Sequence, residues 1–324
     1  MRSRFFIISG FILLSMASWY LLEGFILRNY IALIPILFSI QILLNDFIEM
    51  YLFIRLNSLW FKILIAPGTI LHELSHAVAA KITGCKITDI SLFHLDARGN
   101  LGSVKYTQSR DKFSVLRNFI VGFAPFFGCG IMLVALLNLA QSYHHGEILT
   151  VSIINCQSVE SILRSIALII QRFYQQFLLS SLNPITILIL YLQICLGLGA
   201  APSSVDFKDT FSSAIRHPVG TLILTFLFAS IFYLGEYPLT SRYVVLLFKW
   251  ILLILLVSVS LLTASIPLIY LGTKFMELSL TKKFFTLAIP VLVHLSINNT
   301  ALTLLAFLVT LFTLRYSWIF LRPK

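Results

Sequence analysis

The chain has 324 residues, of which 58% are hydrophobic and 11% charged, and this excludes an ordinary water-soluble domain because too few polar side chains exist to cover its surface. The mean hydropathy of +0.93 predicts an all-α polytopic membrane protein instead. The formal net charge is +11, but Lys and Arg stand mostly between apolar segments, where they set topology and meet anionic lipid headgroups. The expected partner is therefore the lipid bilayer, and no nucleic acid is expected.

Apolar segments long enough to cross the hydrocarbon recur along the chain, and we expect about eight transmembrane helices. The expected ranges are 5–27, 30–53, 59–82, 113–140, 183–201, 218–234 and 243–271, followed by an apolar region, 284–321, that holds one span or two. The first range predicts an uncleaved span rather than a signal peptide, because its hydrophobic character continues to Leu27. Residues 158–179 predict an amphipathic interfacial helix, with a further membrane span as the alternative.

The pattern changes from helical to extended directly after the third range. Residues 86–93 alternate with a period of two, and residues 101–106 form a second extended piece. A turn-prone Arg-Gly-Asn sequence at 98–100 separates them. The sequence therefore predicts a short membrane-associated β-hairpin at this place.

An HExxH motif occupies residues 72–76, inside the third apolar range. Its histidines, His72 and His76, are four residues apart and so fall on one face of a helix, while Glu73 points to the neighbouring side. An ionisable residue at the centre of a membrane helix costs about 2.5–3.5 kcal/mol. Three such residues together indicate a compensating role, and metal ligation is one.

The residue types in this motif are those of a hydrolytic zinc centre. A catalytic zinc takes three protein ligands and keeps one position open, and His72 and His76 supply two neutral imidazoles. The expected cofactor is one Zn²⁺ ion, and Glu73 is expected to accept a proton from the activated water. The four cysteines are scattered without a CxxC pair, so they do not indicate a thiolate site.

A carboxylate is the expected third ligand, and Asp206 is the favoured candidate. If the span at 59–82 descends toward one membrane face, the next ascends and the fifth descends again, so the third and fifth spans end on the same face. His76 lies six residues, about 9 Å, before the end of its helix, and Asp206 follows the end of the other. Asp209 is the nearest rival, and His94 in the hairpin loop is a further alternative.

Charge predicts the orientation. The segment 81–117 holds the richest cluster of Lys and Arg near span ends, and the positive-inside rule puts this segment on the cytoplasmic side. Arg2 and Arg4 argue in the opposite direction if the first two spans are both real. The expected location is a bacterial-type inner or cell membrane, crossed several times, with the active site toward the cytoplasmic side.

The HExxH motif in a membrane helix, followed by a hairpin-like loop and a span with Gly-Phe-Ala-Pro at 122–125, resembles the site-2 protease family of intramembrane zinc metalloproteases. The resemblance covers about 58–210. It implies that both motif histidines and an aspartate at the end of a later helix bind zinc, that Glu73 is the base, and that the hairpin helps to hold an unwound substrate. The context of Asp206 departs from the family's usual Leu-Asp-Gly, because valine precedes it and phenylalanine follows. No loop has room for a PDZ-like domain, so a divergent member without one is expected.

The expected organisation is an N-terminal pair of spans in 1–57, a metalloprotease core in 58–210 and C-terminal spans in 211–324. The expected activity is zinc-dependent endopeptidase cleavage in or near a membrane-spanning segment of a substrate protein, as in regulated intramembrane proteolysis. One alternative is a membrane metallopeptidase of the prenyl-protein type, with Glu236 or Glu277 as third ligand. The other is a catalytically inactive scaffold or a transporter. The sequence does not indicate an oligomeric state.

Overall fold

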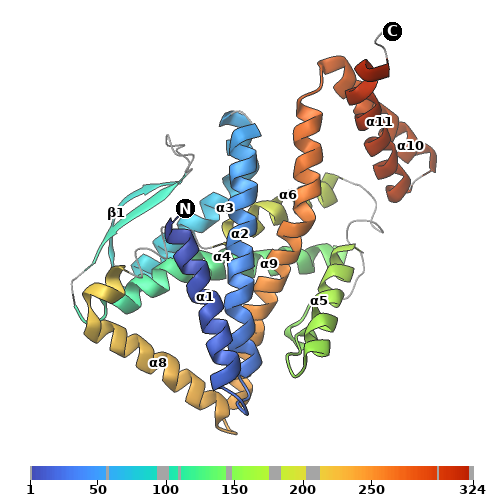
Figure 1. Ribbon diagram of the computed structural model, residues 1–324. Helices are drawn as coiled ribbons and strands as arrows, with labels where there is room; N and C mark the ends of the chain where they lie inside the picture. Colours follow the sequence, from blue (N-terminus) through green and yellow to red (C-terminus); the bar gives the residue numbers. More distant parts are fainter. Residues whose placement is uncertain are drawn as a thin grey trace.

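The computed structural model describes residues 2–55, 58–92, 102–108, 111–143, 148–174, 184–201, 212–297 and 299–320. These residues form mainly α-helices, together with one small antiparallel sheet (Figure 1). The elements are α1 (Arg2–Leu21), α2 (Arg28–Arg55), α3 (Ser58–Ile82), β1 (Lys86–Ser91), β2 (Ser103–Thr107), α4 (Ser114–Tyr143), the short 3-10 helix η1 (Val151–Ile153), α5 (Val159–Tyr174), α6 (Pro184–Gly199), α8 (Pro218–Glu236), α9 (Ser241–Met276), α10 (Leu280–Ile297) and α11 (Thr300–Phe320).

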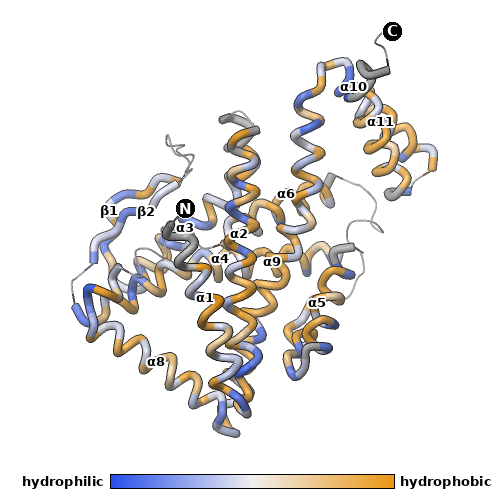
Figure 2. The backbone as a smooth tube through the Cα atoms, in the orientation of Figure 1, coloured by the Kyte–Doolittle hydropathy of each residue, from blue (hydrophilic) through white to orange (hydrophobic). Residues whose placement is uncertain are grey.

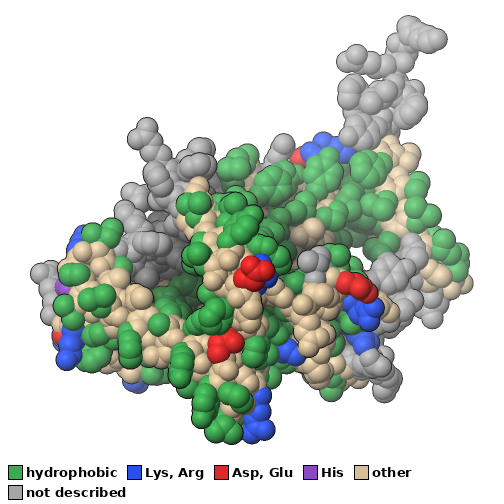
Figure 3. All heavy atoms as spheres, turned by 60° about the horizontal axis from the view of Figure 1, so that its bottom comes forward, with side chains coloured by type: hydrophobic (Ala, Val, Ile, Leu, Met, Phe, Trp, Pro, Cys, Tyr) green, Lys and Arg blue, Asp and Glu red, His purple; other side chains and the backbone are tan. Residues whose placement is uncertain are grey.

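Within the described part of the chain, five helices are long and apolar enough to cross a membrane. They are α4, α8, α9 and α10, together with α2 over Arg28–Leu52. Hydrophobic residues dominate most helices in Figure 2, and hydrophobic side chains are spread over the face seen in Figure 3, as is expected where lipid replaces water. These features support an integral membrane protein, whereas the expected count of eight transmembrane helices is not confirmed.

Three expectations about helix boundaries are decided by the structure. The first helix ends at Leu21 rather than near residue 27, because the chain turns at Gly24, whose φ of 87° suits glycine. The apolar region from 284 to 321 forms two helices, α10 and α11, which pack side by side. The predicted amphipathic helix is α5, of 16 residues, and its buried Ile169 packs into the protein core.

The hydrophobic core is centred on α9. Six consecutive residues, Leu252–Val257, are buried there, so neighbouring helices cover this part of α9 on all sides. Helices α2 and α4 pack nearby, with the ring centroids of Phe38 and Phe126 4.8 Å apart. This core holds α4 in place against the helix that carries the HExxH motif.

Helices α3 and α6 cross with their backbones in contact. A Cβ atom added to Gly68 would lie 1.8 Å from the backbone oxygen of Cys195. One added to Gly199 would lie 2.5 Å from the backbone oxygen of Gly68. Only glycine fits at both positions, so this pair sets the distance between the two helices.

A proline in α3 makes possible a second contact with α6. Pro67 has no backbone N–H, so the carbonyl of Ile63, four residues earlier, loses its usual partner within the helix. The hydroxyl of Tyr191 in α6 donates a hydrogen bond to this carbonyl. A carbonyl that the helix leaves unused thus becomes a contact between two helices.

Helices α3 and α4 also approach closely, at a second glycine. A Cβ atom added to Gly128 in α4 would lie 2.1 Å from Oγ of Ser75, which is the small residue inside the HExxH motif. The Ser75 hydroxyl donates to the carbonyl of Leu71 at 2.7 Å, so its polar group is satisfied within α3. The interpretation of Ser75 as a small residue that permits packing is confirmed.

The predicted β-hairpin is confirmed. Strands β1 and β2 pair in antiparallel fashion, with Ile90 opposite Val104 and an irregularity between Ile87 and Asp89. The amide of Gln108, just after β2, donates to Oδ1 of Asn118 in α4 at 2.9 Å and so attaches the hairpin to that helix. The hairpin therefore has a defined position beside α3 and α4 (Figure 1).

We expect Gly68→Ala to destabilise the protein by about 1–3 kcal/mol, because the new methyl group meets the backbone of α6 and overpacks the crossing. Thermal unfolding of the purified chain in detergent would measure the effect as a lower Tm. Gly272→Ala is the matched control, since a Cβ atom added there meets nothing within 4 Å. Equal Tm values for the two variants would contradict the assigned role of Gly68.

Candidate metal centre

The two motif histidines converge through the same ring atom. His72 and His76 are one turn apart on α3, and their Nε2 atoms lie 3.2 Å from each other. The rings are 4.8 Å apart between centroids, with an angle of 78° between their planes. His76 is buried and His72 is partly buried, so water has limited access to the space between them.

Each histidine uses its other ring nitrogen to contact a backbone carbonyl. Nδ1 of His72 is 2.8 Å from the carbonyl oxygen of Gly199 in α6. Nδ1 of His76 is 2.8 Å from the carbonyl oxygen of Val121 in α4. A carbonyl oxygen carries no proton, so Nδ1 must be the donor in both bonds. In a neutral ring this leaves the lone pair on Nε2 as an acceptor.

The geometry of these atoms fits a zinc ion. Two lone pairs that face each other at 3.2 Å repel unless a cation lies between them. Two nitrogen ligands, each about 2.0–2.1 Å from a tetrahedral zinc, lie about 3.3 Å apart. Imidazole rings oriented by second hydrogen bonds are the usual arrangement for zinc ligands. The donor set and its spacing therefore match two of the ligands that zinc requires.

Glu73 lies on a different face of α3, under the hairpin. Its side chain is partly buried, and Gly102, the residue before β2, packs against it. A Cβ atom added to Gly102 would lie 2.6 Å from Cγ of Glu73 and 3.0 Å from the carbonyl oxygen of Ser91. The hairpin thus limits the positions that the Glu73 carboxylate can take, next to the histidines on the same helix.

The favoured third ligand, Asp206, lies outside the described residues, as do Asp209 and His94. Among the residues that the structure describes, no three His, Cys, Asp or Glu side chains gather closely enough to hold a metal ion. The chain does leave α6 at Gly199, whose carbonyl is in contact with His72. Asp206 follows Gly199 by seven positions.

The glutamates of the alternative function have other partners. The carboxylate of Glu236 accepts a hydrogen bond from the backbone N–H of Ile26 at 2.8 Å, at the end of α8. Glu277, just after α9, accepts from Arg315 at 2.6 Å and from Lys274 at 3.3 Å. The hydrogen bond from Arg315 is the main cause of a lowered pKa of Glu277. These contacts do not support either glutamate as the third ligand.

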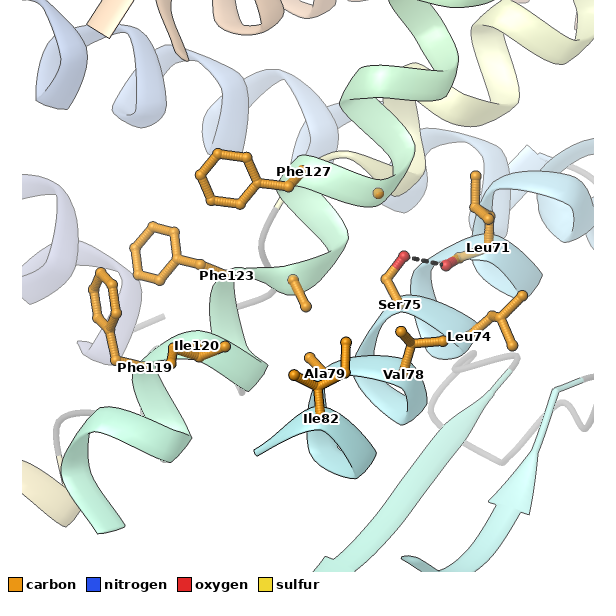
Figure 4. A pocket seen from close by; sticks show the side chains of 12 residues that line it. Leu71, Leu74, Ser75, Val78, Ala79, Ile82, Phe119, Ile120, Phe123 and Phe127 are labelled. Carbon is orange, nitrogen blue, oxygen red and sulfur yellow. Dashed lines mark hydrogen bonds between the residues drawn. The ribbon is translucent and has the colours of Figure 1, made fainter. Parts of the chain in front are cut away.

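An apolar groove of about 420 Å³ runs beside the motif, between α3 and α4 (Figure 4). Two residues of the motif itself, Leu74 and Ser75, contribute to its wall. Farther along the groove, Val78 belongs to the α3 side, and Phe119 and Phe123 belong to the α4 side (Figure 4). The groove can therefore accommodate an apolar group beside the HExxH motif.

Two functional atoms were not anticipated from the sequence, namely the carbonyl oxygens of Val121 and Gly199. Both belong to backbone groups that lack a normal partner within their helix. Pro125 has no N–H to offer the carbonyl of Val121, and Gly199 is the last residue of α6, where carbonyls remain unsatisfied. Pro125 could have indicated from the sequence that the carbonyl of Val121 lacks its usual helical donor. The partner that each carbonyl finds depends on how the helices pack.

We expect His72→Ala to reduce bound zinc from about one ion per chain to a small fraction, because a single imidazole and a carboxylate bind zinc weakly. Metal analysis of the purified chain would measure this. His294→Ala is the control, since Nδ1 of His294 contacts the hydroxyl of Thr303 between α10 and α11. Equal zinc contents in the two variants would contradict the assignment of the site.

Comparison with known proteins gives one match. Residues 50–199 match the family model described as Peptidase M50B-like, and this range includes α3, the hairpin, α4 and α6. No curated protein and no solved structure matches the chain significantly. The match covers the helix with the HExxH motif and both helices whose carbonyls orient its histidines. Over this range the chain is similar to the site-2 protease (M50) family of membrane peptidases.

Proposed function

We propose that the chain is a zinc-dependent intramembrane endopeptidase that hydrolyses a peptide bond in or near a membrane-spanning segment of a substrate protein. The observation that carries this proposal is the 3.2 Å approach of the two Nε2 atoms, with each Nδ1 bonded to a carbonyl. The match of residues 50–199 to a peptidase family model supports it independently.

His72 and His76 would hold one zinc ion through Nε2, with Asp206 as the third ligand. The position of α6 supports this choice, because its last residue contacts His72 and the chain then continues toward Asp206. When bound, zinc supplies a Lewis acid that acidifies water and polarises the substrate carbonyl. The carbonyls of Gly199 and Val121 keep the two imidazole rings in the tautomer that leaves Nε2 available.

Glu73 is the proposed base. It follows His72 directly and lies on the adjacent face of α3, so it is next to the histidines on the same helix. It would accept the proton from the attacking water and pass it to the leaving amine as the peptide bond breaks. The hairpin packed on Glu73 through Gly102 would limit its motion and exclude bulk water from the carboxylate.

The substrate would enter from the bilayer in an extended form. A membrane-spanning helix satisfies its own backbone hydrogen bonds, so a peptide bond becomes accessible only after local unwinding. Both strands of the two-stranded sheet are edge strands, which can pair with an extended segment. The apolar groove beside Leu74 and Ser75 would take a hydrophobic side chain of that segment. We also propose that cleavage occurs near the cytoplasmic face, because of the basic residues in 81–117.

Glu73→Gln should abolish cleavage while the protein still binds zinc. The amide cannot accept the proton from water, and loss of a general base typically costs 10²–10⁴-fold in rate, so a decrease of at least about 100-fold is expected. Cleavage of a membrane-tethered reporter in reconstituted vesicles would be measured together with zinc content. Cleavage at the wild-type rate would rule out the protease function, whereas absence of zinc from the wild-type chain would favour an inactive scaffold or a transporter.

The third ligand can be assigned by comparing two aspartates three residues apart. Asp206→Asn should lower zinc affinity about 10-fold or more, because a neutral amide is a poor substitute for a carboxylate ligand. Asp209→Asn should leave the affinity close to that of the wild type. Competition with a chromophoric chelator would measure both values, and the reverse result would transfer the role to Asp209.

A further inference from the structure

We propose that Pro125 is a positioning residue for the metal site, because it frees the backbone carbonyl that orients His76. This inference rests on the zinc site of the proposed function but not on peptidase activity. The inference concerns α4, which supplies none of the three proposed zinc ligands, His72, His76 and Asp206.

The first step of the argument is the hydrogen-bond pattern of α4. In an α-helix the N–H of each residue donates to the carbonyl four residues earlier. Pro125 lies inside α4 and has no N–H, and the residue four positions earlier is Val121. The proline ring also crowds this carbonyl and turns it away from the helix axis. The oxygen of Val121 is therefore both unused within α4 and directed outward.

The second step is the partner that this oxygen finds. Nδ1 of His76 is 2.8 Å from the carbonyl oxygen of Val121. Val121 is itself buried against Ala79 and Ala80 of α3, so packing of the two helices presses this carbonyl toward His76. In an apolar interior an imidazole N–H without an acceptor is costly, and a carbonyl without a donor is equally so. One hydrogen bond removes both costs.

The third step is the effect on the metal ligand. The bond from Nδ1 holds the proton on that nitrogen and fixes the ring orientation, so that Nε2 faces Nε2 of His72 at 3.2 Å. If residue 125 had an N–H, the helix would compete for the Val121 carbonyl and draw it back toward the axis of α4. The His76 ring would then have a weaker acceptor and a less defined position. Loss of such an outer contact typically lowers metal affinity 10–100-fold.

The decisive variant is Pro125→Ala, which restores the N–H with the best helix-forming residue. We expect the full-length protein in detergent to bind zinc about 10-fold or more weakly, as measured by competition with a chromophoric chelator. With Co²⁺ in place of zinc, the visible absorption bands should shift, because the ligand geometry changes. The metal-free variant should unfold at the same temperature as the wild type or higher, since a proline has been removed from a helix.

The matched control is Pro35→Ala, which removes a buried proline from the interior of α2, a helix that packs mainly on α1 and α9. This variant should keep the zinc affinity and the Co²⁺ spectrum of the wild type. The proposal is overturned if Pro125→Ala binds zinc within about twofold of the wild type, or if Pro35→Ala loses as much affinity. Failure of the wild-type chain to bind zinc would instead refute the proposed function, and zinc binding without proteolysis would leave the role of Pro125 intact.

If Pro125→Ala does not accumulate as a folded protein, the α-hydroxy analogue of alanine at position 125 provides a second test. This residue keeps the small side chain of alanine, but an ester oxygen replaces the N–H. Like proline, it therefore has no backbone hydrogen-bond donor. We expect the protein with this ester to bind zinc more tightly than Pro125→Ser, which has a backbone N–H at the same position. Equal affinities for the ester and Pro125→Ser would show that the donor is irrelevant and would overturn the proposal.

Discussion

Placing two imidazoles inside a helix bundle imposes one requirement on its surroundings, because each ring N–H must find an acceptor within the protein. The acceptors here are backbone carbonyls that their own helices leave unused. One is released inside α4 by Pro125, and the other belongs to the last residue of α6. Both bonds require backbone to approach α3 closely, which explains why Gly68 and Ser75 are small and why Gly128 faces the latter.

The proposed metal ligands and the proposed base lie on different faces of the same helix. The histidines point between α4 and α6, where the carbonyls orient them, while Glu73 is covered by the hairpin through Gly102. In the proposed mechanism Glu73 transfers the proton, while the Nδ1 atoms of both histidines bond to backbone carbonyls. The apolar groove lies along a third side of α3, between the motif and α4 (Figure 4). The proposed metal ligands, the proposed base and one wall of the apolar groove thus lie within about three turns of one helix.

Two prolines inside helices of this fold free backbone carbonyls that then form contacts between helices. In a soluble helix the missing N–H is a loss that water can partly compensate, but in an apolar interior the freed carbonyl must be satisfied by protein. Pro67 frees a carbonyl that accepts from Tyr191, and Pro125 frees one that contacts His76. In both cases a local defect of a helix becomes a specific contact between helices.

The sequence by itself determined the helical membrane class and the β-hairpin, because both follow from local periodicity. It also indicated His72, Glu73 and His76 as the candidate site, from the fixed spacing of ligands on a helix. It did not determine which atoms orient the histidines or which side of α5 faces protein. Those features depend on distances between segments far apart in the chain, such as α3 and α6, and only tertiary packing sets such distances. The proposed ligand Asp206 shares this dependence, since seven residues separate it from the end of α6.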